Sequence, residues 1–115
     1  MSNKKKLKNK KKIIFFGHGS HLKVVKEIAQ LNNFEIKGII CDGLKKKKTI
    51  FNLPYLGNRR YLKKINKKEI FFSVAIGDNK LREKIFNMLK KQGFKFAKLI
   101  HPSALISKNS LIKDG

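Results

Sequence analysis

The chain contains 115 residues, of which 29 are Lys or Arg and 7 are Asp or Glu, so its formal net charge is +22. This length supports one domain with a continuous core, and the single cysteine excludes a disulfide framework or a Cys-rich zinc module. No apolar run approaches the ~18 residues of a membrane helix, and the run after the basic start is shorter than a signal-peptide core, so we expect a cytoplasmic protein.

Lysine accounts for most of the positive charge and outnumbers arginine 26 to 3. Proteins that read nucleic acid usually use arginine for bidentate contacts. We therefore interpret most of these lysines as solvated surface residues that reflect an A/T-rich codon bias. A basic module that binds nucleic acid or another polyanion is the alternative, and the net charge predicts at least weak, salt-sensitive attraction to such partners.

The first part of the chain predicts a tail, a strand and a helix. Residues 1–11 are mostly lysine and asparagine with little to bury, so we expect a disordered basic tail. Residues 12–16 form a continuous apolar run that ends at a glycine, which is typical of a strand buried on both faces. A helix is predicted from Ser20 to the asparagine pair at 32–33. Its apolar stripe consists of Val24, Val25, Ile28, Ala29 and Leu31.

The middle of the chain alternates between extended and irregular segments. Residues 35–41 predict a second strand that ends at an Asp-Gly pair. The lysine-rich residues 44–52 are interpreted as a loop, and residues 53–57 as a short extended piece. Residues 58–65 predict one or two helical turns.

The last part predicts a further strand–helix–strand unit. Residues 69–76 form the longest strand pattern in the chain. Asp78 is the predicted N-cap of a helix that stops at Gly93, and residues 94–100 predict a last strand. The apolar stripe of this helix consists of Leu81, Ile85, Met88 and Leu89. The alternation predicts an α/β domain over residues 12–99, with a parallel sheet covered by helices.

A different period begins near the end of the chain. Ile100, Ile106 and Ile112 recur every six residues, which is typical of a hexapeptide β-helix. Residues 100–115 are therefore interpreted as the start of such a structure. Chance recurrence of three isoleucines in an isoleucine-rich chain is the alternative.

A glycine-containing turn, Gly17-His-Gly-Ser-His21, joins the first strand to the first helix. Glycines at 17 and 19 permit a tight turn and let backbone amides approach a phosphate at the helix N-terminus. Leu22 fills the third glycine position of the dinucleotide fingerprint, which disfavours a dinucleotide site and NAD-dependent chemistry. Two interpretations stay open: a nucleotide diphosphate site, or a turn that binds nothing.

Two later turns follow strands that would end at the same edge of a parallel sheet. Asp42 comes 25 residues after Gly17, and in nucleotide-binding βαβ folds an acid at about 20 residues accepts hydrogen bonds from ribose. A turn aspartate with no ligand explains Asp42 at least as well. Gly77, Asp78 and Asn79 follow the next long strand, where ligands bind in parallel sheets, and Asp78 would cap the helix as well.

The sequence predicts no complete catalytic or metal site. His18, His21 and His101 are potential acid–base groups, but no paired carboxylates, Ser-His-Asp order or metal-ligand spacing accompanies them. We expect His101 to be a partly buried residue at a strand end and Cys41 to be a buried strand residue.

Five short motifs occur in an order that resembles a known family. They are Gly17-His-Gly-Ser-His-Leu-Lys-Val-Val25, Cys41-Asp42, Leu53-Pro-Tyr-Leu-Gly57, Val74-Ala-Ile-Gly-Asp-Asn79 with Arg82, and Leu99-Ile-His-Pro-Ser-Ala104. Over about residues 12–115 the chain is similar to the N-terminal part of the NeuD/PglD-type sugar acetyltransferases. These include sialic acid O-acetyltransferases and UDP-4-amino-sugar N-acetyltransferases of bacterial glycan pathways.

The resemblance implies a small Rossmann-like domain that binds a UDP-sugar or a related nucleotide sugar. In the family a left-handed β-helix follows, which binds acetyl-CoA, forms a trimer and carries the catalytic histidine. The glycine turn would face the phosphates and sugar, and the acid after the second strand would lie on the uridine side. The substrate-binding residues implied in this way are Gly17, Gly19, Ser20, His21, Asp42, Gly77, Asp78 and Asn79.

The sequence departs from the family in two places. The family often has a second acid beside the position of Asp42, whereas here Cys41 and Gly43 flank it. Only 15 residues follow Ile100, fewer than the several coils that a β-helix needs. We therefore expect a chain that binds the sugar nucleotide, has no position for acetyl-CoA or for the trimer interface, and does not transfer an acetyl group alone.

Overall fold

The computed structural model describes residues 10–19, 21–43 and 49–99 of the chain. These residues form a six-stranded sheet, two α-helices and one 3₁₀ helix. In chain order the elements are β1 (Lys11–Phe16), α2 (His21–Leu31), β2 (Phe34–Ile40), β3 (Thr49–Ile50), β4 (Leu53–Gly57), η1 (Arg59–Lys64), β5 (Ile70–Val74), α3 (Asn79–Lys91) and β6 (Lys95–Phe96).

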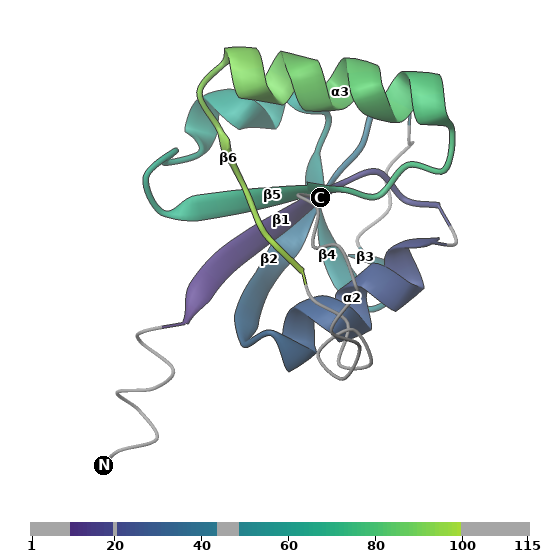
Figure 1. The fold of residues 1–115 in the computed structure, drawn as a ribbon, viewed down its shortest axis with the longest axis vertical. Coiled ribbons are helices and arrows are strands. Elements are labelled where there is room, and N and C mark those ends of the chain that lie inside the picture. The colour runs from purple at the N-terminus through teal and green to yellow at the C-terminus, as the bar shows by residue number, and fades with distance from the viewer. Residues whose placement is uncertain (1–9, 20, 44–48, 100–115) are drawn as a thin grey trace, which may run out of the picture.

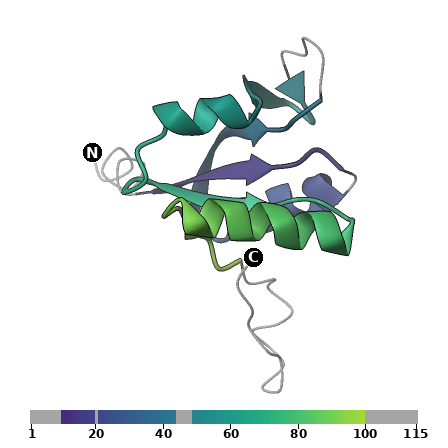
Figure 2. The ribbon, with the colours of Figure 1, turned by 90° about the horizontal axis from the view of Figure 1, so that it is seen from above.

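The sheet is parallel except at one edge. Its strand order is β3-β4-β2-β1-β5-β6, and only β3 and β4 pair antiparallel. In Figure 2 the arrows of β1, β2 and β5 point the same way. The chain leaves β1 in one direction to β2 and β4, then returns to the other side of β1 as β5. This is a Rossmann-like α/β arrangement, as predicted, with the reversal of strand order beside β1.

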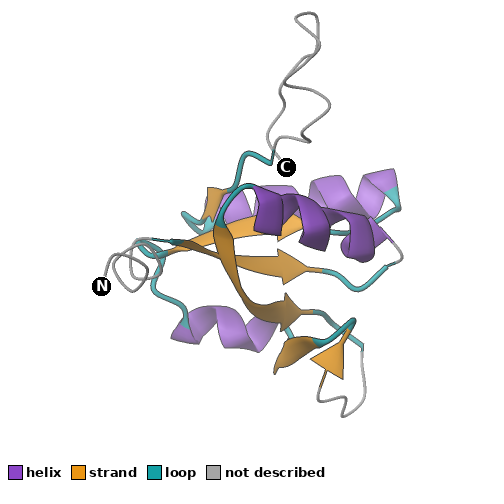
Figure 3. Ribbon diagram, turned by 90° about the horizontal axis from the view of Figure 1, so that it is seen from below, coloured by secondary structure: helices purple, strands orange, loops and turns teal. Residues whose placement is uncertain are grey.

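Both faces of the sheet are buried, which explains the continuous apolar run of β1. Ile13 and Phe15 pack on the face covered by α2, whereas Ile14 and Phe16 pack on the face covered by α3 and η1. Figure 1 shows α2 and α3 on opposite sides of the strands. Figure 3 shows the strands between the short helix η1 on one side and the two longer helices, which overlap in this view. A strand with one face exposed to solvent would instead alternate between apolar and polar residues.

The two helices bury fewer of the predicted residues than expected. In α2, Val25 and Ala29 are buried together with Leu22, but Val24 is 50% and Leu31 66% exposed. In α3, Ile85 and Leu89 are buried, but Leu81 is 46% exposed. Each helix contacts only one face of the sheet, so the buried stripe is narrower than the apolar pattern. The predicted ends of α3 are confirmed: Asp78 Oδ1 accepts from the Leu81 amide at 2.9 Å, and Gly93 follows the helix with a φ of +91°.

Several strand boundaries differ from the predictions. β1 begins at Lys11, one residue early. The segment 44–52, interpreted as a loop, contains the short strand β3, which pairs with β4. β5 ends at Val74 rather than at residue 76, and β6 covers only two of the seven residues predicted for the last strand. Short pairings of this kind are decided by the neighbouring strand and not by a local pattern.

Residues 1–9 of the basic tail predicted over residues 1–11 lie outside the described residues, and Lys11 belongs to β1 instead. His101 and the six-residue repeat from Ile100 onward also lie outside the described residues. The start of a β-helix therefore stays a prediction. No helix in the described ranges is long and apolar enough to cross a membrane.

We predict that Leu89→Ala lowers the free energy of unfolding by about 2–5 kcal/mol, because it deletes methyl groups from a fully buried site and leaves a cavity between α3 and the sheet. The same substitution at the exposed Leu31 is the matched control, with an expected change of about 0.5 kcal/mol or less. Urea denaturation measures both, and equal losses would contradict the assignment of the two side chains.

Candidate functional site

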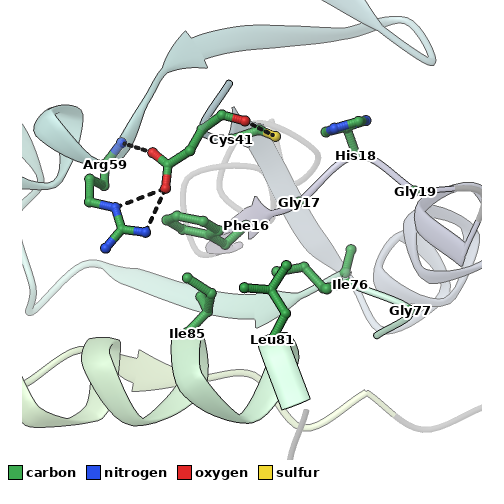
Figure 4. A pocket seen from close by; sticks show the side chains of 12 residues that line it. Phe16, Gly17, His18, Gly19, Cys41, Arg59, Ile76, Gly77, Leu81 and Ile85 are labelled. Atoms are coloured by element: carbon green, nitrogen blue, oxygen red, sulfur yellow. Dashed lines mark hydrogen bonds and ion pairs between the residues drawn. The ribbon is translucent and has the colours of Figure 1, made fainter. Parts of the chain in front are cut away.

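A pocket of about 320 Å³ lies at the carboxyl edge of the sheet. It opens where β1, β2 and β5 end, beside the point at which the strand order reverses (Figure 4). Open α/β sheets bind ligands at such a crevice. The lining residues are Phe16, Gly17, His18, Gly19, Cys41, Asp42, Arg59, Ala75, Ile76, Gly77, Leu81 and Ile85.

The turn after β1 forms one wall, and it depends on glycine at its first position. Gly17 has a φ of +120°, and its amide donates to the Ile40 carbonyl at 2.9 Å. A Cβ there would collide with the carbonyl oxygen of Ala75 and lie 2.8 Å from Ile76 Cγ1. Gly19 is different, because its nearest neighbour for a Cβ would be the Ala75 oxygen at 3.9 Å. Gly17 is therefore needed by the fold, whereas Gly19 leaves open space in the pocket.

The opposite wall contains an ion pair between Asp42 and Arg59. Arg59 Nη2 and Nε lie 2.7 and 2.8 Å from Asp42 Oδ2, and the Arg59 amide donates to Oδ1 at 3.0 Å. The two side chains are 39% and 53% exposed, with the acid the more covered. Figure 4 shows the pair at one end of the pocket, with His18, Gly19 and Gly77 at the other.

Hydrogen bonds between β2 and β4 bring this pair together. The Cys41 amide donates to the Gly57 carbonyl at 3.0 Å, and the Tyr55 hydroxyl donates to the Cys41 carbonyl at 2.8 Å. These bonds continue the pairing of the two strands past the end of β2. Asp42 and Arg59 therefore face each other across adjacent strand ends, although 17 residues separate them in sequence.

The local environment moves three pKa values. Burial would raise the pKa of Asp42, but the side-chain and backbone hydrogen bonds from Arg59 and its positive charge outweigh burial and place the pKa below its usual value. Burial, and secondarily the charge of Asp42, raises the pKa of the Cys41 thiol. The pKa of Tyr55 is raised by burial and then by Cys41 and Asp42. Cys41 is buried and protonated at neutral pH, as expected of a structural cysteine.

The floor between the two walls is apolar. It is formed by Phe16, Ile76, Leu81 and Ile85. Leu81 was predicted to be part of the core stripe of its helix, but it lines the pocket and is half exposed. An apolar floor with a charged pair at one end and a glycine turn at the other suits a ligand that has a flat ring and an anionic part.

The structure brings four of the predicted site residues to this pocket: Gly17, Gly19, Asp42 and Gly77. Asp78 and Asn79 are not among its lining residues. Asp78 caps α3, and the Asn79 side-chain oxygen accepts from Arg82 Nη2 at 2.6 Å. Ser20 lies outside the described residues, and only the backbone of His21 is described, as the first residue of α2.

Arg59 was missed by the sequence analysis. The available signal was Gly57, which ends a segment interpreted only as a short extended piece. Recognising that segment as a parallel strand would have assigned the residues after it to the same sheet edge as Asp42. Within the described ranges no group of three or more His, Cys, Asp or Glu side chains is placed to hold a metal ion.

Comparison with known proteins gives a consistent result. A family model described as the PglD N-terminal domain matches residues 12–89. A curated relative, the UDP-N-acetylbacillosamine N-acetyltransferase of Bacillus subtilis (strain 168), is 26% identical over 107 residues, which are 91% of this chain and 50% of the relative. The chain thus spans about half the length of the curated relative it matches.

Several solved chains are similar in fold, including two that contain different ligands. PerB from Caulobacter crescentus, in complex with CoA and GDP-perosamine, has a TM-score of 0.68 and 28% identity over 79% of this chain and 42% of that one. The acetyltransferase domain of PglB from Neisseria gonorrhoeae FA1090, in complex with acetyl coenzyme A, has a TM-score of 0.69 and 28% identity, covering 82% of this chain and 45% of that one.

The lowered pKa of Asp42 makes the ion pair a pH-dependent contribution to stability. A carboxyl group whose pKa is lowered in the folded state adds stability at pH values above its unfolded pKa of about 4. This stability is lost as the pH falls through the folded-state pKa. We predict that Asp42→Asn lowers the free energy of unfolding at pH 7 by at most about 1 kcal/mol, because solvent screens the half-exposed pair.

The difference between Asp42→Asn and the parent should shrink as the pH falls below the unfolded pKa of about 4, as measured by urea denaturation at pH 7 and at about pH 2. Glu35→Gln is the control, since it removes the same charge from a pair with a single contact of 3.3 Å, and its effect at pH 7 should be smaller. A loss in Asp42→Asn that is the same at both pH values would contradict the prediction.

Proposed function

The chain belongs to the PglD N-terminal domain family, and we propose that it is the nucleotide-sugar-binding domain of a bacterial sugar O- or N-acetyltransferase. The observation that carries the proposal is the convergence of the glycine turn, the Asp42–Arg59 pair and Gly77 on one pocket. Segments that opened onto separate surfaces would not have supported a shared ligand.

The pocket suits the parts of a nucleoside diphosphate sugar. The backbone between Gly17 and Gly19 leads into the N-terminus of α2, where the helix dipole favours phosphate. The apolar floor with Phe16 suits a nucleobase, at the end that holds the ion pair. We propose Gly17, Gly19, Ser20, His21, Asp42, Gly77, Asp78 and Asn79 as substrate-binding residues, the last two through the position of the turn they form.

The acetyl donor would belong to another part of the enzyme. Both of the similar structures described above contain CoA or acetyl coenzyme A, and we propose acetyl-CoA as the donor for whichever polypeptide carries the transferase domain. The pocket described above would then hold the acceptor sugar nucleotide and would supply no catalytic residue. A UDP-sugar is the proposed ligand, as the name of the curated relative suggests, and the cytoplasm is the proposed location.

We predict that Gly19→Val weakens the binding of a UDP-sugar by at least about tenfold, because the isopropyl group would fill space that the ligand needs without displacing the backbone. Gly19→Ala, which adds one methyl group, should have a smaller effect, and Gly77→Val should resemble Gly19→Val. Isothermal titration calorimetry measures the affinities, with the parent expected to bind in the micromolar range.

Thermal melts of the same variants provide the control for folding, since among the described residues, chain neighbours aside, no atom would lie closer than 3.9 Å to a Cβ at either position. Equal affinity of the parent and both valine variants, with intact folds, would contradict the proposed site.

A second candidate function, binding of nucleic acid, is favoured by a lysine-lined pocket at the opposite edge of the sheet. This pocket, of about 540 Å³, includes Lys10, Lys11 and Lys98 with Phe71 and Phe96. Lys95 Nζ lies 4.5 Å from the centroid of the Phe71 ring. Lysines beside aromatic rings can bind phosphates and bases, but the half-buried rings offer few stacking surfaces.

We predict that single-stranded DNA binds at low salt and is released near ~0.15 M salt, because the attraction is non-specific. Fluorescence anisotropy with a labelled oligonucleotide measures this. Binding that persists at the higher salt and is weakened by a combined Lys10→Ala and Lys11→Ala variant would favour the second function.

A further inference from the structure

Asp42, which lines the pocket, already forms an ion pair and hydrogen bonds with Arg59. Arg59 donates to both carboxylate oxygens of Asp42, through its amide to Oδ1 and through Nε and Nη2 to Oδ2. Among the residues that the structure describes, Asp42 is the one acidic side chain that lines the pocket. A ligand entering the pocket therefore meets a neutralised pair rather than a free acceptor.

Arg59 keeps most of its own donors. A guanidinium carries five N–H groups and accepts no hydrogen bond. Two of its nitrogens contact Asp42 with one N–H each, so three N–H groups remain without an acceptor among the described residues. Because Asp42 holds the guanidinium group in place, the remaining N–H groups have a fixed orientation toward a ligand.

The pair lies at the end of the pocket that suits a ring. Figure 4 shows Arg59 beside the Phe16 ring and the Ile85 side chain, away from the glycine turn. The phosphate groups of a nucleotide would be held by the backbone at the glycine turn, and the base would then lie over the apolar floor toward Arg59.

Building on the proposed function, we infer that Arg59 selects the base of the nucleotide sugar, favouring bases with a carbonyl where others carry an amino group. Uracil and guanine have such a carbonyl oxygen, whereas cytosine and adenine have an amino group at the corresponding position. A donor-only guanidinium can pair with the carbonyl but not with the amino group. Asp42 acts as a positioning residue that holds the guanidinium.

The test compares the binding of UDP, GDP, CDP and ADP by isothermal titration calorimetry to the full chain and its variants. The parent should bind UDP and GDP about tenfold or more tightly than CDP and ADP. Arg59→Gln should reduce that ratio to about one, because the glutamine amide both donates and accepts hydrogen bonds. Arg59→Lys should reduce it only partially, because lysine is still a donor without an acceptor but lacks the planar guanidinium. Asp42→Asn should reduce it partially, because the guanidinium is no longer held.

Arg60→Gln is the matched control, because Arg60 is the next residue, is exposed and does not line this pocket. It should retain the ratio of the parent. Circular dichroism checks that the Arg59 variants fold, which the half-exposed position of the side chain favours.

The remaining outcomes separate this inference from the proposed function. If the parent binds all four diphosphates equally, or if Arg59→Gln weakens all four by the same factor, the selection by Arg59 is wrong and the nucleotide site stands. If the parent binds none of them, the proposed function fails as well.

Discussion

The site depends on the close approach of two backbones at the end of β1. The Ala75 amide donates to the Phe16 carbonyl at 2.8 Å, and the Gly17 amide donates to the Ile40 carbonyl at 2.9 Å. These two bonds extend the pairing of three strands beyond their ends and bring Gly17 against Ala75, where no side chain would fit. The segments that follow β1, β2 and β5 diverge directly after this point, and the space between them is the pocket.

The second determinant is a side-chain contact that closes the pocket at its far end. Asp42 belongs to the turn after β2, and Arg59 begins the 3₁₀ helix after β4. Their pairing gives the half-exposed carboxylate a partner at the edge of an apolar floor. It also reduces the repulsion that an unpaired carboxylate would exert on an anionic ligand. One contact therefore serves both the fold and the proposed binding chemistry.

The pocket combines several kinds of contact with a ligand. The described residues offer a pocket with backbone donors, an apolar floor and a neutralised pair, and its lining contains no acid–base pair in hydrogen-bond contact other than Asp42 with Arg59. Such a pocket can hold and orient a ligand. The chain spans about half the length of the curated relative named above.

The α/β fold, the order of the main elements and the glycine turn follow from the sequence, because the periods of burial, the Asp78 cap and the glycine at 17 are local properties of the chain. Which apolar residues are buried was decided by the tertiary structure, since a helix on a flat sheet covers only a narrow stripe and leaves Leu31 and Leu81 exposed. The role of Arg59 was decided in the same way. Its partner lies on another strand, and the pairing of β2 with β4, which no local pattern encodes, brings the two together.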